Sequence, residues 1–106
     1  MDLNCERAMS LIIPATRAAT AKILKREYKM SQSDIARRLG IAQGMVSRYV
    51  RGNYSPKIRK LESIVVKRGL ERPVVSAAVS KRDVSVQLDR LASDRRIVAS
   101  AIKLVG

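Results

Sequence analysis

Two short amphipathic segments with only three residues between them constrain the fold of this chain most. The first begins after Ser31 and ends at Gly40, and the second begins after Ala42 and ends at Gly52. Glycine most easily adopts the left-handed conformation that ends a helix, and helices joined by so short a turn must cross steeply. Their apolar positions have helical spacing: Ile35, Ala36 and Leu39, then Met45, Val46, Tyr49 and Val50.

Helices are also predicted on either side of this pair. Ser31 is expected to cap the first segment, accepting from the amide of Asp34. Pro14 suits a first helical position, so we expect a helix over residues 14–28, preceded by a short helical arm. Ser55-Pro56 similarly begins a helix that ends at Gly69.

The last third of the chain is predicted to be helical as well. Pro73 opens an apolar segment over residues 74–79, which suggests burial. Asp83 caps a long amphipathic pattern that forms either one helix or two with a break at Ser93-Asp94. Because no stretch shows sustained strand alternation, we predict an all-α fold, a bundle of five to six helices.

Composition excludes several functions. The 106 residues carry a formal net charge of +13, contain no His and only one Cys, and have 46% hydrophobic residues. The chain should therefore fold rather than remain a disordered basic tail. Without His or a second Cys we expect no metal, no disulfide, no cofactor and no enzyme activity. Cys5 is expected to be a small half-buried residue, suited to a reducing cytoplasm.

The positive charge lies mainly before residue 83. Residues 1–82 hold 18 Lys and Arg against 6 Asp and Glu, whereas residues 83–106 hold 4 against 3. So large an excess implies a polyanionic partner, with nucleic acid preferred to an acidic membrane surface. The longest apolar runs have only three residues, so no membrane span is expected.

Residues Gln32 to Tyr49 resemble the helix-turn-helix of the Cro/C1-type repressor superfamily. Ala36 stands where the two helices cross closely, Gly40 makes the turn, and a small apolar seam fixes the angle, formed by Ile35, Leu39, Ile41, Val46 and Tyr49. The wider chain is similar to short helix-turn-helix regulators common in archaea. The resemblance covers residues 31–52 firmly and 14–69 more broadly, so we place a DNA-binding domain at 1–69 and a helical dimerisation region at 70–106.

The resemblance implies which residues would contact double-stranded DNA. In that superfamily the second helix lies in the major groove, so the candidates for base contact are Gln43, Gly44, Ser47 and Arg48. Gln can pair bidentately with adenine and Arg with guanine. The candidates for the DNA backbone are Ala42, Arg37, Arg38, Arg51, Asn53, Tyr54, Lys57, Arg59 and Lys60.

Two positions depart from the family pattern. Ala42 replaces the Ser or Thr that often caps this helix, so a DNA phosphate could accept from the free N–H groups instead. Gly44 costs a helix about 1 kcal/mol. Either this is a tolerated weakness or the missing side chain lets the backbone approach DNA closely, and the sequence leaves both open.

The C-terminal pattern has two interpretations. Its apolar positions could pack back on the same domain, or they could form a homodimer interface. The dimer is favoured because proteins of this fold commonly bind two DNA half-sites as symmetric dimers. We predict the dimer, through Val84, Leu88, Leu91, Val98, Ile102 and Val105. Arg95 interrupts the pattern, which argues against a continuous coiled coil.

The predicted function is a sequence-specific transcriptional regulator. A non-specific architectural or RNA-binding protein is the alternative, although Phe and Trp are absent and Tyr28 and Tyr49 are expected to be buried rather than available for base stacking. A ligand-sensing regulator is a third hypothesis. Residues 70–106 leave no room for a separate small-molecule domain, so its pocket would have to lie at an interface.

Overall fold

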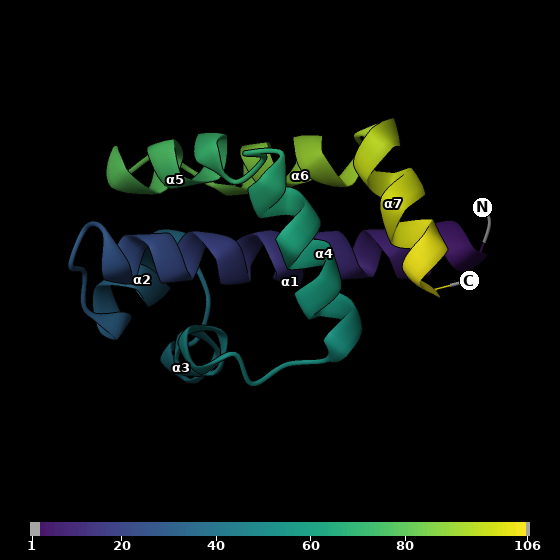
Figure 1. Ribbon diagram of the computed structural model, residues 1–106. Coiled ribbons are helices and arrows are strands. Elements are labelled where there is room, and N and C mark those ends of the chain that lie inside the picture. The colour runs from purple at the N-terminus through teal and green to yellow at the C-terminus, as the bar shows by residue number, and fades with distance from the viewer. Residues whose placement is uncertain (1–2, 106) are drawn as a thin grey trace.

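The computed structural model describes residues 3–105, except for the side chains of residues 3–6, 9 and 105, and this part of the chain consists of helices joined by short connections, with no strand (Figure 1). Its seven helices are α1 (Leu3–Arg26), α2 (Gln32–Leu39), α3 (Gln43–Arg51), α4 (Pro56–Lys67), α5 (Arg72–Val79), α6 (Ser85–Ala92) and α7 (Arg95–Val105). The all-α prediction is confirmed. The described range contains seven helices rather than the predicted five to six, because the C-terminal pattern divides into two helices. The predictions that Cys5 is half-buried and that Val105 belongs to a dimer interface concern side chains outside the described part of the structure.

Helix α1 is the centre of the fold, because it contacts all six other helices. In Figure 1 it runs across the middle, with α3 on one side, α5 and α6 on the other, and α4 and α7 crossing it. Small residues allow these close approaches, and Ala8, Ala15, Ala18 and Ala21 are all fully buried. Residues from both ends of the chain therefore share one core.

Pro14 lies inside α1 rather than at its first position, so the predicted arm and the predicted helix form one helix. A proline within a helix costs about 3 kcal/mol. Ile12 is fully buried, as are Ala8 and Ala15. Burying Ile12 alone contributes about 2 kcal/mol, so this buried face offsets the cost of the proline. The helix also ends before residue 28, and Tyr28 is 49% exposed, so its predicted burial is wrong.

The two crossing helices form as predicted. Ser31 Oγ accepts from the amide of Asp34 at 3.1 Å, and Gly40 adopts φ +67° immediately after α2. Gly52 adopts φ +74° after α3. The apolar seam is buried at Ile35, Ala36, Leu39, Val46 and Tyr49, with Ile41 half-buried beside it.

The C-terminal pattern forms two helices, as the second of the two predictions had it. The Asp94 carboxylate accepts from the amides of Arg96 and Ile97, so it caps α7 after the break. Asp83 accepts from the amide and hydroxyl of Ser85, and these bonds hold the pKa of Asp83 below its usual range. No helix in the described range is long and apolar enough to cross a membrane.

Three residues predicted to form a dimer interface are buried in the chain's own core. Val84, Leu88 and Leu91 are between 3% and 8% exposed and pack with residues of α1 and α5 in a single cluster. Val98 and Ile102 are half-buried at its edge. The side chains of the first three are therefore largely covered without a partner chain, while the oligomeric state itself remains a prediction.

Candidate nucleic-acid interface

Helix α3 has one buried face and one exposed face. Val46 and Tyr49 are 0% and 3% exposed, and they fix the helix against the core. The opposite face is exposed at Gln43, Gly44, Arg48 and Arg51, whereas Ser47 is half-buried. Met45, expected in the apolar pattern, is 37% exposed. The predicted base-contacting residues thus lie together on one helix, and within the described residues the side chains of Gln43 and Arg48 form no hydrogen bond or ion pair.

The first turn of α3 is open at its N-terminus. Ala42 is exposed and supplies no side-chain acceptor for the helix N–H groups. A Cβ placed on Gly44 would meet no atom within 4 Å, and the residue has an ordinary helical backbone. Nothing in the described fold therefore requires glycine at position 44, so a tolerated weakness and a close approach of the backbone to DNA both remain predictions.

Exposed basic residues continue from α3 into α4. Lys57 and Lys60 are exposed on α4, and Asn53 is exposed in the connection before it. The Ser55 hydroxyl accepts from the amide of Ile58 and caps the helix, as predicted. From Gln43 to Leu61 the sequence contains five Lys and Arg residues and no acid. Exposed basic residues are therefore present from the end of α3 to the first turns of α4.

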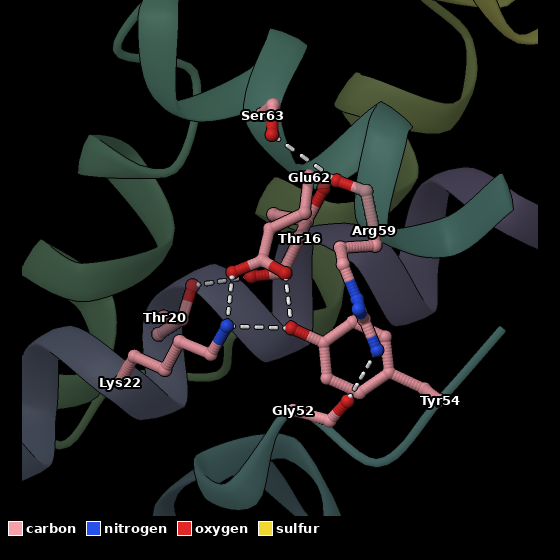
Figure 2. A network of polar contacts seen from close by, with 8 residues as sticks. All are labelled: Thr16, Thr20, Lys22, Gly52, Tyr54, Arg59, Glu62 and Ser63. Carbon is pink, nitrogen blue, oxygen red and sulfur yellow. Dashed lines mark hydrogen bonds and ion pairs between the residues drawn. The ribbon is translucent and has the colours of Figure 1, made fainter. Parts of the chain in front are cut away.

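A partly buried polar network holds the connection between α3 and α4 (Figure 2). Lys22 of α1 donates to Glu62 Oε2 at 2.9 Å and to the Tyr54 hydroxyl at 2.6 Å, and that hydroxyl donates to Glu62 Oε1. Arg59 donates to the carbonyl oxygen of Gly52 at 2.9 Å and lies 5.8 Å from the centre of the Tyr54 ring. The network therefore joins α1, α4 and the residues that follow α3.

The pKa values in this network reflect burial and close partners. Burial works to lower the pKa of Lys22, but the hydrogen bonds with Tyr54 and Glu62 and the charge of Glu62 raise it above its ordinary value. Burial, followed by the hydrogen bond to Glu62, raises the pKa of the Tyr54 hydroxyl. Both groups thus keep their protons, and Lys22 remains the cation that balances the buried carboxylate.

Two predicted DNA-backbone contacts are held inside the protein instead. The Tyr54 hydroxyl is occupied by Lys22 and Glu62. Arg38 is half-buried, and its guanidinium donates to Asp34 at 3.3 Å and to the carbonyl oxygens of Ala78 and Val79 at 2.9 and 3.1 Å. Arg38 therefore links α2 to the end of α5. The structure gives these two side chains internal partners that the basic composition alone could not reveal.

Arg37 and Arg59 keep more freedom than Arg38. The Arg37 side chain is 79% exposed and pairs with Asp34 at 3.0 Å on the helix surface. Such an exposed pair contributes little and can exchange for a stronger anion. Arg59 is exposed but donates to Gly52. The sequence pattern did not predict the roles of Lys22 and Glu62; the one available signal was an acid placed beside Leu61 in the apolar stripe of α4.

Comparison with known proteins agrees with this geometry. Residues 21–66 match the family model described as helix-turn-helix, the Cro/C1 type that residues 32–49 resemble, and this match supports a DNA-binding regulatory role. The matched segment includes the end of α1 from residue 21, all of α2 and α3, and α4 except its last residue. Neither the curated proteins nor the solved structures give a match. The predicted resemblance is confirmed for this segment.

Proposed function

We propose that this protein is a transcriptional regulator that binds specific sequences in double-stranded DNA by placing α3 in the major groove. The observation that carries the proposal is the division of α3 into two faces. Val46 and Tyr49 anchor one face in the core, while Gln43 and Arg48 are exposed on the other. A rigidly held helix with exposed side chains that suit adenine and guanine edges is what direct base readout needs.

Under this proposal, phosphate contacts surround the base contacts. The open N-terminus of α3 at Ala42 donates N–H groups to a phosphate. Arg51, Asn53, Lys57 and Lys60 are exposed after the first turns of α3 and supply further contacts. Arg37 joins them by exchanging its surface partner, whereas Tyr54 and Arg38 act as supports for the backbone that carries the contacts. Ser47, a predicted base contact, is half-buried on the same helix.

We further propose that the protein acts as a homodimer on a palindromic site, because helix-turn-helix proteins commonly place two recognition helices one turn of DNA apart. The interface must use surfaces other than Val84, Leu88 and Leu91, which the core already covers. Val98 and Ile102 at the edge of the core remain available in part. Sedimentation equilibrium of the free protein and of its DNA complex tests the stoichiometry.

Selection of genomic fragments followed by sequencing tests specificity. The expected result is a common palindrome with half-sites centred about 10 base pairs apart. Equal affinity for the selected site and for a random duplex would instead support a non-specific architectural protein, which the net charge of +13 alone would allow.

Two variants separate base contact from phosphate contact on the selected site. Arg48→Ala should lose about 1–3 kcal/mol of discrimination at one base position. Lys57→Ala should weaken all duplexes alike and reduce the slope of log K against log salt by about 1. Fluorescence anisotropy with the selected site and with single-base variants measures both effects. Identical losses on every duplex for both variants would contradict the proposed role of Arg48.

A further inference from the structure

A basic cleft lies between the helix-turn-helix and the C-terminal helices. It has a volume of about 990 Å³ and is lined by α1, α2 and residues 81–88, with no contribution from α3 or α4. Its five cations come from three separate parts of the chain: Arg17 from α1, Arg37 and Arg38 from α2, and Lys81 and Arg82 from the connection between α5 and α6. The cleft therefore lies apart from α3, and Arg37 is the one lining residue that it shares with the proposed phosphate contacts.

The acids of this cleft already have partners. Asp34 accepts from Arg37 and Arg38, and Asp83 accepts from the amide and hydroxyl of Ser85. Against these two carboxylates, the five cations leave an excess of positive charge on the lining. Arg82 has only a 3.5 Å contact with the Ser76 hydroxyl. The cations outside α2 are thus not neutralised by the acids in the cleft.

Arg17 provides the observation that points to a ligand. Its Nε–H group is buried but has no hydrogen-bond acceptor among the described residues. Leaving a buried donor on a charged group without an acceptor is unfavourable, and such groups in folded proteins nearly always have a partner. Arg17 also lines the cleft, so a shift of its side chain toward a bound anion would give this enclosed donor the acceptor that the described residues do not provide.

We propose that this cleft binds a small anion that carries phosphate or carboxylate groups. Its volume lies within the range typical of small-molecule sites, and its charged lining suits a polyanion rather than an apolar ligand. Arg17 would supply a directed donor to an anionic oxygen, and Lys81 and Arg82 would supply charge from the opposite element. A bound anion would thus connect α1 with the connection between α5 and α6.

This proposal does not depend on the proposed DNA binding, so the test uses the free full-length protein. Pyrophosphate and citrate are titrated by isothermal calorimetry at constant ionic strength in chloride. Arg17→Gln removes the buried donor, and the double variant Lys81→Gln/Arg82→Gln removes two exposed cations that the core does not use. The matched control Arg90→Gln/Lys103→Gln removes the same charge from exposed positions outside the cleft.

Saturable binding of at least one probe with one site per chain is expected. Both cleft variants should weaken it by about tenfold or more, the loss expected for one charge-assisted hydrogen bond, while the control changes it little. If Arg17→Gln fails to fold, the double variant decides alone. Absence of saturable binding, or equal weakening in the control, would overturn the proposal.

A DNA phosphate is the other source of the same chemistry, and duplex binding distinguishes the two sources. If the cleft holds a small anion, Lys81→Gln/Arg82→Gln should change duplex affinity no more than the control does. If neither probe binds and the double variant alone loses duplex affinity, the cleft contacts DNA and the proposal is overturned.

Discussion

Replacing Glu62 with Gln should destabilise the protein by removing the charge that balances Lys22. Glu62 accepts from Lys22 and from the Tyr54 hydroxyl through its two carboxylate oxygens. The amide of Gln has an oxygen at one of these two positions and an NH₂ group at the other, so it cannot offer an acceptor to each donor where that donor now bonds. One donor would face an NH₂ group, and Lys22 would keep a partly buried charge without a counterion.

The expected cost follows from the burial of the pair. Breaking a fully buried ion pair by removing one partner costs about 3–5 kcal/mol. The side chains of Glu62 and Lys22 are 9% and 26% exposed, so solvent reaches the cation that remains. We therefore expect a loss of about 2–3 kcal/mol, which lowers the Tm by about 10 °C in a domain of this size.

Thermal unfolding followed by circular dichroism measures this loss. Glu27→Gln is a matched control, because it removes the same charge at an exposed position. Adding Lys22→Met to the Glu62→Gln variant should restore part of the stability, since the unpaired cation is removed. Equal Tm values for Glu62→Gln and Glu27→Gln would refute the reasoning that the network stabilises the fold.

Two further predictions use other parts of the structure. Gly44→Ala should raise the free energy of unfolding by up to about 1 kcal/mol, because the position is helical and has space for a methyl group, yet weaken DNA binding if the backbone approaches DNA there. Thermal unfolding and anisotropy together test this, and an unchanged affinity would favour the tolerated weakness. The second concerns pH: burial raises the pKa of Tyr49, and the pKa values of Lys22 and Tyr54 are also raised. A group whose pKa is higher in the folded protein than in the unfolded chain contributes stability. That stability is fully present below the unfolded-state pKa, about 10 for these groups, and is lost as the pH rises through the folded-state pKa. The Tm should therefore fall as the pH rises above about 10, with a shallower fall for Tyr54→Phe; an identical profile for that variant would contradict the role assigned to Tyr54.

Local signals were sufficient for most of the helix boundaries. Ser31 and Ser55 cap helices through their own side chains, and Gly40 and Gly52 take the left-handed conformation that ends them. These features depend on a few neighbouring residues, which the sequence displays directly. Pro14 was misleading because its local preference for a helix start competes with the burial of α1 along its whole length.

The candidate site could also be predicted only in part from the sequence. The exposed face of α3 could be predicted, because the spacing of Val46 and Tyr49 determines which side of the helix is buried. The internal roles of Tyr54 and Arg38 could not, since each depends on a partner at least eight residues away in the sequence. A basic or hydroxyl side chain has the same appearance in a sequence whether its partner is DNA, solvent or another helix.

The sequence by itself determined the helical class, the tight turn between α2 and α3, and the side chains that lie along α3, because helical periodicity and turn chemistry act over a few residues. Only the tertiary structure decided that Val84, Leu88 and Leu91 complete the monomer's core and that Lys22, Tyr54 and Glu62 form one network. It also brought Arg17, Lys81 and Arg82 to one cleft. The physical reason is that burial and charge pairing depend on which distant segments α1 brings together, and this long-range packing leaves no local pattern in the sequence.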